Sequence, residues 1–310
     1  MTAKLTPEVE DLFRRMRALN MPAFHTLTPV EARGLREQTA ALTTGDHIEV
    51  DGTVHDGVID VAHGTIPVRF YTPRSWQRGS VVYFHGGGWV MGDLETHDAL
   101  CRGLTNASGL RVMAVQYRLA PEHPYPAAMD DAWEAARWLA EDDPGAIAVG
   151  GDSAGGTLAT CVAARARGTD IGIAAQLLIY PVTDMHSFDT PSYSEFAEGY
   201  WLTSKAMEWF RNHYVPGKSV WQHPDVSPLY RDDLTDMPPA MVITAHFDVL
   251  RDEGAGYARR LGEAGVDVTY RCYDGMIHGF MAMPGVFPQG AAALAEAGEM
   301  LRGAVSRDEK

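Results

Sequence analysis

Apolar residues in this chain are grouped in short runs that alternate with longer stretches in which they recur every three or four positions. From Val58 onward, the short runs predict buried strands and the longer stretches predict helices. This alternation predicts an α/β fold, with a mostly parallel central sheet flanked by helices on both faces. The expected strands cover residues 66–71, 80–84, 111–116, 147–150, 174–180, 240–245 and 266–273, and the expected helices cover residues 96–106, 127–139, 154–166, 253–264 and 289–305.

Two parts of the chain stand outside this alternation. Residues 7–19 and 29–40 have helical periodicity but precede the first strand signals, so they are candidates for a lid rather than for the central layers. Residues 184–236 separate two expected core strands and are rich in Tyr, Trp, Ser, Pro and His, with a helical stretch near residues 204–214. Their aromatic content argues against disorder, and insertions of this length are usually functional. We therefore expect one α/β domain with an added cap.

The chain carries 41 acidic and 26 basic residues, a formal net charge of −15. Such a charge repels phosphate backbones and anionic membrane surfaces, so nucleic acid is not an expected partner. The N-terminal residues lack a signal-peptide pattern and no apolar run is long enough to span a bilayer, which favours a cytoplasmic protein. Cys101, Cys161 and Cys272 are widely spaced, which favours core packing in a reducing compartment over a disulfide framework or a zinc site.

The segment GDSAG at residues 151–155 follows an expected strand and precedes a helix rich in small residues. It matches the G-x-S-x-G turn, in which a serine stands on a sharp strand-to-helix bend with its hydroxyl exposed above the sheet. A glycine-rich turn without chemistry would show the same pattern, which is common by itself. A phosphate-binding loop is disfavoured because neither G-K-[ST] nor G-x-G-x-x-G is present here. Ser153 is the candidate nucleophile.

A second glycine-rich segment, HGGGW at residues 85–89, follows the expected strand 80–84. A tetrahedral acyl intermediate carries a negative oxygen, which preorganised backbone N–H groups stabilise by about 3 kcal/mol each. Glycines allow a loop to bring such amides close to a substrate. We expect an oxyanion hole formed by the amides of Gly87, Gly88 and Ala154, in a loop shaped by His85 and Gly86. The alternative interpretation is a flexible glycine turn.

The fold that uses such a turn orders its reactive residues as serine, then acid, then histidine. Asp248 stands just past the expected strand 240–245, and His278 lies in a loop past the last apolar strand, at the carboxyl edge of the sheet. Two competitors are weaker, because His246 precedes the acid and Asp252 can cap the helix that follows it. Ser153, His278 and Asp248 are therefore the candidate nucleophile, general base and base-orienting acid.

Together these motifs resemble the bacterial hormone-sensitive-lipase-like esterases, in the group that carries Gly-Asp-Ser-Ala-Gly. The matching stretches are residues 85–88 (HGGG), 117–124 (YRLAPEHP), 151–156 (GDSAGG), 248–254 (DVLRDEG) and 278–280 (HGF). The resemblance implies the α/β-hydrolase fold, with a helical cap made of residues 1–47 and 184–236 on a core of residues 48–183 and 237–310. It also implies a carboxylic ester hydrolase for short to medium acyl esters that often forms homodimers. The acyl-enzyme mechanism needs no metal and no organic cofactor.

Two positions depart from the family pattern. Val249 replaces the usual proline after the acid, and Thr157 replaces a common asparagine; both concern loop geometry rather than proton transfer. We expect Arg118 and Glu122 to form a structural ion pair that supports the oxyanion loop.

The substrate is less constrained than the reaction. Trp89, Tyr200 and Trp201 are candidate walls of the substrate pocket, and their bulk favours short acyl groups. The same triad serves enzymes that act on amides, formamides, lactones and peptides, which sequence does not separate. A receptor without turnover, like the plant gibberellin receptors that resemble this family, is disfavoured because those receptors lack the histidine that His278 supplies. An interaction scaffold has only the acidic charge in its favour.

Overall fold

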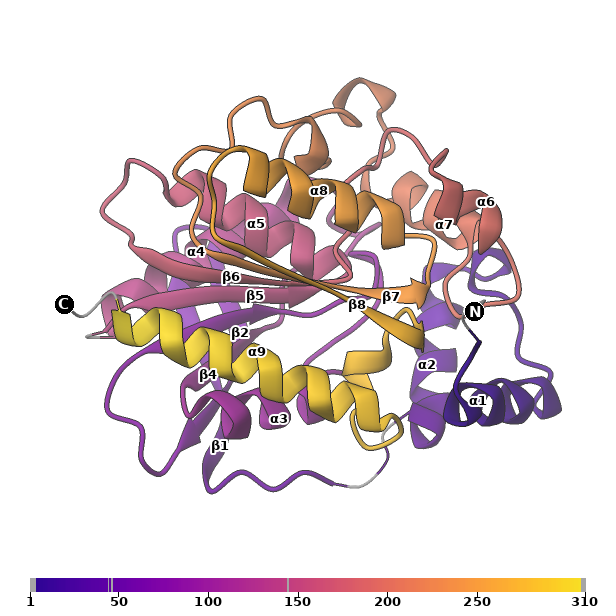
Figure 1. Cartoon of the computed structure of the whole chain (residues 1–310), viewed down its shortest axis with the longest axis horizontal. Helices are drawn as coiled ribbons and strands as arrows, with labels where there is room; N and C mark the ends of the chain where they lie inside the picture. The colour runs from indigo at the N-terminus through magenta and orange to yellow at the C-terminus, as the bar shows by residue number, and fades with distance from the viewer. Residues whose placement is uncertain (1–3, 44, 46, 144, 308–310) are drawn as a thin grey trace.

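An eight-stranded sheet forms the middle layer of the molecule (Figure 1), which the computed structural model describes for residues 4–43, 45, 47–143 and 145–307. The strands lie in the order β1-β2-β4-β3-β5-β6-β7-β8. All neighbouring pairs from β4 to β8 are parallel, whereas β2 is antiparallel to both β1 and β4. Their bounds are β1 Gly52–Val61, β2 Gly64–Pro73, β3 Ser80–Phe84, β4 Arg111–Val115, β5 Ile147–Asp152, β6 Ile173–Ile179, β7 Ala240–Phe247 and β8 Val268–Ile277.

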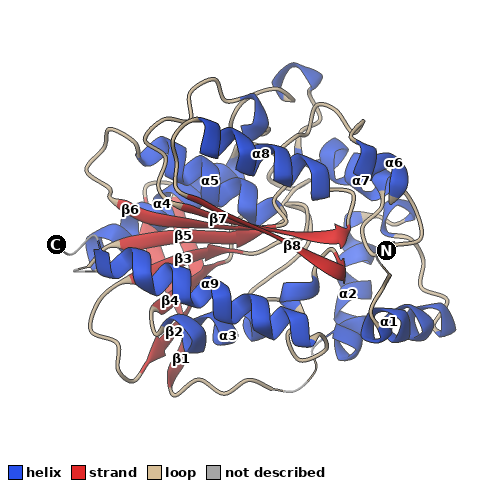
Figure 2. Cartoon of the chain, viewed as in Figure 1, coloured by secondary structure: helices blue, strands red, loops and turns tan. Residues whose placement is uncertain are grey.

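Helices cover both faces of this sheet. Helices α3 (Asp98–Ser108) and α9 (Pro288–Arg307) lie side by side on one face, and α4 (Ala127–Asp142), α5 (Ala154–Ala166) and α8 (Arg251–Glu263) cover the other (Figure 2). The remaining helices gather at the end of the sheet toward which the arrows of β7 and β8 point (Figure 2). They are α1 (Pro7–Ala18), α2 (Pro29–Thr43), α6 (Pro191–Glu195) and α7 (Ser204–Tyr214).

The central strands are apolar because both of their faces are covered. Every residue of β3, β4 and β5 is buried, and parallel strands buried on both sides are typically continuous apolar runs. The alternation in the sequence predicted these strands, and their neighbours, to within a few residues of their observed bounds.

Two elements escaped the sequence pattern. Strand β1 begins at Gly52, whereas the apolar signal begins only at Val58, because this edge strand is largely exposed and contains His55 and Asp56. The helix α6 has five residues, too few to show helical periodicity. One cysteine also departs from expectation: Cys101 and Cys161 are buried but Cys272, on the edge strand β8, is exposed.

A few residues of the expected core and cap segments lie outside the described part of the chain. Residues 1–3, 44 and 46 of the expected cap segment 1–47, and residues 144 and 308–310 of the expected core, lie outside them. Within the part of the chain that is described, no helix has the length and apolar character needed to cross a bilayer.

Candidate active site

Ser153 stands at the sharp turn between β5 and α5. Its φ of 56° and ψ of −119° are strained for a residue with a side chain. The turn is held by the backbone, because the Ser153 N–H donates to the carbonyl oxygen of Ile179 at 2.8 Å. Gly155 is required for close approach, since a Cβ at this position would lie 1.9 Å from the carbonyl oxygen of Phe84. The strained turn, held by these contacts, therefore places the Ser153 side chain at the carboxyl end of the sheet.

His278 and Asp248 meet Ser153 from the ends of β8 and β7. The Ser153 Oγ lies 3.0 Å from His278 Nε2, and His278 Nδ1 lies 2.8 Å from Asp248 Oδ2. The Asp248 side chain is fully buried, and its Oδ1 accepts the backbone N–H of Leu250 at 3.0 Å. A carboxylate only accepts hydrogen bonds, so it keeps the proton of His278 on Nδ1 and leaves Nε2 free to accept the serine proton.

The two competing residues lie elsewhere. Asp252 accepts the backbone N–H of Ser192 at 2.8 Å and pairs with Arg251 at 2.7 Å. His246 faces Asp274, at 3.4 Å. The structure thus brings together the three residues that the order of motifs selected, and it places Asp252 and His246 in other contacts.

The glycine loop, residues 85–91, follows β3 and borders the same space as Ser153. Gly87 and Gly88 have φ values of 115° and 62°, which favour residues without a side chain. The Gly87 carbonyl oxygen accepts the N–H groups of Val90 and Met91, at 3.2 and 2.9 Å. Gly87 and Gly88 line the cavity next to Ser153, so their backbones are close to where a substrate carbonyl would lie.

A buried carboxylate connects the glycine loop to the serine turn. Asp152 accepts hydrogen bonds from the Gly86 N–H and the Tyr83 hydroxyl, both at 2.9 Å, and from His97 Nε2 at 3.3 Å. Burial alone would raise the pKa of Asp152, but the adjacent His97 and Tyr83 lower it below its ordinary value. This carboxylate therefore fixes residue 86 relative to residue 153. Sequence reasoning missed this role, because nothing local distinguishes Asp152 from any other x in G-x-S-x-G.

His85 supports the loop from the other side. Its ring stacks on Tyr117 with centroids 4.2 Å apart, and its Nδ1 donates to the Gly86 carbonyl oxygen at 2.8 Å. The Tyr117 hydroxyl donates to the His85 carbonyl oxygen at 2.7 Å. Burial lowers the pKa of His85 to about 4, so its ring is neutral near pH 7.

The ion pair expected between Arg118 and Glu122 is wrong. Arg118 instead pairs with the buried carboxylate of Asp131, at 2.7 Å, and Glu122 pairs with Arg33 of α2, at 2.8 Å. Arg118 and Glu122 are close in sequence, which suggested that they pair, but the loop turns the two side chains toward different elements. Arg33 was missed because 89 residues separate it from Glu122.

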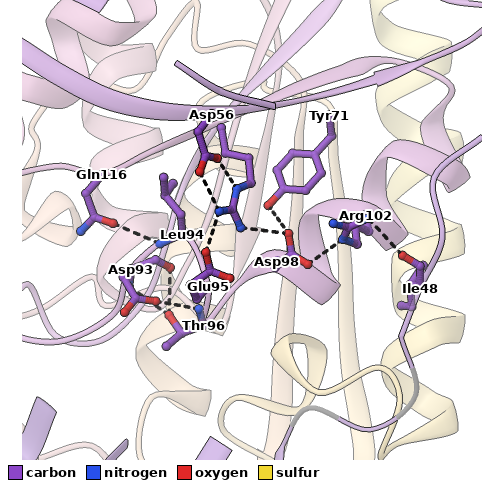
Figure 3. Close-up of polar contacts among 11 residues, drawn as sticks. Ile48, Asp56, Tyr71, Asp93, Leu94, Glu95, Thr96, Asp98, Arg102 and Gln116 are labelled. Carbon is purple, nitrogen blue, oxygen red and sulfur yellow. Dashed lines mark hydrogen bonds and ion pairs between the residues drawn. The ribbon is translucent and has the colours of Figure 1, made fainter. Parts of the chain in front are cut away.

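A cavity of about 580 Å³ opens onto Ser153 and His278. Much of its wall is apolar, including Met91, Leu202, Met207, Phe210 and Met283. One wall is polar, and there Arg69 donates to Asp56, Glu95 and Asp98 while Arg102 donates to Asp98 at 2.6 Å (Figure 3). Glu95, Asp98 and Arg102 line the cavity itself. In the described part of the chain, no three His, Cys, Asp or Glu side chains are grouped as a metal site requires.

Two of the three expected pocket residues line the cavity in the structure. Trp89 and Trp201 are among the residues that line the cavity, and Tyr200 is not. The Tyr200 ring instead stacks on Phe247, with centroids 5.4 Å apart, and meets Phe196 edge to face. Tyr200 and Trp201 are adjacent in an irregular segment, where no periodicity tells which side chain faces inward.

Comparison with known proteins identifies the fold family. Residues 81–282 match a protein family whose description is alpha/beta hydrolase fold. The esterase LipI of Mycobacterium tuberculosis is 42% identical over 77% of this chain and 78% of its own length. The ethyl acetate hydrolase of Pseudomonas putida is 37% identical over 90% of this chain and 91% of its own.

Solved structures extend the similarity over nearly the whole chain. An ester hydrolase from the metagenome of Lake Arreo, solved with a bipyridine phosphonate derivative, shares 40% identity with a TM-score of 0.91, covering 96% of this chain and 98% of that one. A thermostable esterase from Pseudomonas putida shares 34% identity with a TM-score of 0.92, covering 98% of each chain. The fold class expected from the sequence is confirmed, and this chain belongs to the α/β-hydrolase family.

Proposed function

We propose that this chain is a carboxylesterase that hydrolyses carboxylic esters through an acyl-enzyme formed on Ser153. The observation that carries the proposal is the hydrogen-bonded series from Ser153 through His278 to Asp248, which opens onto a cavity of about 580 Å³. Relatives at 37–42% identity that are named as esterases or ester hydrolases support the same reaction.

In the proposed reaction, His278 accepts the Ser153 proton as the hydroxyl oxygen attacks the ester carbonyl. Asp248 orients the imidazole and stabilises the imidazolium that forms. The amides of Gly87, Gly88 and Ala154 stabilise the oxyanion of the tetrahedral intermediate. His278 then protonates the departing alcohol, and a water molecule that it activates hydrolyses the acyl-enzyme.

Short to medium acyl esters are the substrates that the cavity favours. Apolar side chains from residues 184–236, such as Leu202, Met207 and Phe210, enclose the space beside Ser153. Residues of the N-terminal segment, including Met21 and Phe24, line it as well. Both segments thus act as a cap over the α/β core, which supports the division into a core of residues 48–183 and 237–310 and a cap of residues 1–47 and 184–236.

Two further properties accompany the proposal. Strand β8 is the last in the sheet order, and the backbone of its outer edge offers a surface on which a second copy could pair to form a homodimer. All three cysteines are free thiols, which fits a cytoplasmic, reducing setting. Light scattering coupled to gel filtration tests the dimer, and cell fractionation with an antibody against the native chain tests the location.

The direct test is Ser153→Ala. We expect hydrolysis of p-nitrophenyl acetate and butyrate to fall to the uncatalysed rate, because the attacking oxygen is gone. A p-nitrophenyl alkylphosphonate should phosphonylate the Ser153 oxygen and release p-nitrophenol, so the wild type should gain the mass of the phosphonyl group and the variant should not. Ser306→Ala, which removes an exposed hydroxyl near the C-terminal end of α9, is the matched control and should keep full activity. Esterase activity in Ser153→Ala, with an unchanged circular dichroism spectrum, would refute the assignment.

A further inference from the structure

Arg33 of α2 makes four hydrogen bonds to the loops that follow β3 and β4. Its Nε donates to the carbonyl oxygen of Val90 and its Nη2 to that of Ala120, both at 2.8 Å. Its two Nη atoms also bind both oxygens of the Glu122 carboxylate, at 2.8 Å each. Four of its five N–H groups are therefore used, in the planar fork geometry that a lysine does not offer.

Of the two carbonyl groups that Arg33 binds, that of Val90 belongs to the glycine loop and that of Ala120 belongs to a residue hydrogen-bonded to the loop. Val90 closes the turn that starts at Gly87, and the Ala120 N–H donates to the carbonyl oxygen of Trp89 at 2.8 Å. The same turn presents Gly87 and Gly88 to the cavity. A contact on the Val90 carbonyl group thus acts within three residues of both amides that we assign to the oxyanion hole.

The cap holds this loop at a second point. Phe210 of α7 packs so closely on Gly88 that a Cβ there would lie 2.1 Å from the ring. The α7 helix is itself tied to the N-terminal segment, because Trp209 Nε1 donates to the carbonyl oxygen of Leu27 at 3.1 Å. Arg33 and Phe210 therefore bind the loop from two cap segments that are connected to each other.

We propose that Arg33 is a positioning residue, through which the docking of α2 holds the glycine loop in the geometry that stabilises the oxyanion. The inference rests on the proposed function, because it assigns a role within the same reaction. It makes the cap a determinant of turnover and not only of substrate access. Because Arg33 lowers the pKa of Glu122 to about 2, the carboxylate that anchors it stays ionised throughout the neutral range.

Loss of Arg33 should affect the chemical step more than binding. Without the guanidinium, the carbonyl groups of Val90 and Ala120 lose their donor and the loop is free to shift. A displacement of about 1 Å at a catalytic group can cost on the order of a hundredfold in rate. The loss of an interaction that is made only in the transition state lowers kcat and kcat/KM together and leaves KM unchanged.

The test compares Arg33→Ala, Arg33→Lys and Glu122→Gln with Arg167→Ala. Arg167 is a matched control: it also pairs with a carboxylate and donates to carbonyl oxygens, those of Ala164, Asp233 and Thr235. It lies at the C-terminal end of α5, a helix of about 20 Å whose other end begins at Ser153. With p-nitrophenyl butyrate, we expect kcat of Arg33→Ala to fall by about ten- to a hundredfold with KM changed less than about threefold. Arg33→Lys should restore part of this loss, Glu122→Gln should cost a few-fold at most, and Arg167→Ala should keep wild-type kcat.

Two readouts separate positioning from general destabilisation. A trifluoromethyl ketone, which forms a tetrahedral adduct with the serine, should lose affinity for Arg33→Ala in parallel with kcat/KM. Ethylguanidinium added at millimolar concentration should raise kcat of Arg33→Ala but not of Arg167→Ala. If Arg33→Ala does not fold, Arg33→Lys must still lower kcat without a matching change in KM.

Either of two results would overturn the proposal. In the first, Arg33→Ala and Arg33→Lys have the same kcat as Arg167→Ala. In the second, the substitutions raise KM and leave kcat unchanged. An inactive wild type would instead refute the ester hydrolase assignment, so the two failures are distinguishable.

Discussion

At the scale of single residues, the site depends on glycine positions where the surrounding atoms leave no space for a Cβ atom. Gly88 combines a φ of 62° with the ring of Phe210 at its surface. A methyl group there would overlap the ring, and either the loop or α7 would have to move. The proposed oxyanion donor would move with the loop.

Gly88→Ala should therefore lower kcat on p-nitrophenyl esters by about a hundredfold, as removal of one oxyanion donor does. Because the overlap is with Phe210, the double variant Gly88→Ala/Phe210→Ala should recover part of the loss. Phe210→Ala alone supplies the reference for this double-mutant cycle. A wild-type kcat in Gly88→Ala would show that Gly88 is not a donor.

The residue scale also shows where sequence reasoning stops. The serine, the acid and the histidine stand in fixed order beside strand ends, so their meeting at one edge of the sheet followed from the alternation of elements. The partner of Glu122 did not follow, because Arg33 lies 89 residues away in a helix whose docking no local pattern specifies. Tyr200 and Trp201 were equivalent in sequence, and only the packing of an irregular segment separated them.

At the scale of elements, α8 carries a buried carboxyl group that ties it to the chain leaving β6. Glu253 is 2% exposed, and its Oε1 accepts the backbone N–H groups of Thr183 and Asp184 at 2.7 and 3.2 Å. Its Oε2 has no hydrogen-bond partner among the described residues. Burial raises the pKa of Glu253 well above its ordinary value, and the nearby Asp184 raises it further.

This raised pKa makes the stability of the fold depend on pH. Folded Glu253 keeps a proton that the unfolded chain has lost, so its contribution is present at acid pH and is lost as pH rises, by up to about 1.4 kcal/mol per pH unit. Glu253→Gln, which carries no titrating proton, should become more stable relative to the wild type between pH 5 and pH 9. Urea unfolding at several pH values measures the difference.

The matched control for this prediction is Glu141→Gln. The Glu141 side chain is 75% exposed on α4, so its stability difference from the wild type should stay flat over the same pH range. A flat difference for Glu253→Gln as well would mean that Glu253 is ionised in the folded protein.

At the scale of the whole molecule, the cavity is enclosed by parts of the chain that are far apart in sequence. Its floor is formed at the carboxyl ends of the parallel strands, and its walls come largely from residues 21–48, 93–102 and 201–210. The strands themselves were predictable because apolar runs mark buried strands. The walls were not, because the docking of these segments on the core depends on contacts between residues that are far apart in sequence.

Trp201→Ala should shift the preferred p-nitrophenyl ester toward longer acyl chains, because it removes an indole from the cavity wall. Tyr200→Ala is the matched control: it removes a neighbouring ring that stacks on Phe247 outside the cavity, and it should leave the preferred chain length unchanged. A panel from acetate to decanoate measures both. An identical shift in the two variants, or none in Trp201→Ala, would contradict the assignment of this wall.

The reacting side chains and the walls of the cavity are supplied by different segments. Ser153, Asp248 and His278 follow the carboxyl ends of β5, β7 and β8, whereas the walls belong largely to segments that no strand pairing constrains. Substitutions in the walls can therefore accumulate without disturbing the hydrogen bonds among Ser153, His278 and Asp248. During evolution, the substrate range of such an enzyme can change while the reaction stays the same. Arg33 sets a limit on that freedom, since the helix that supplies it also restrains the glycine loop.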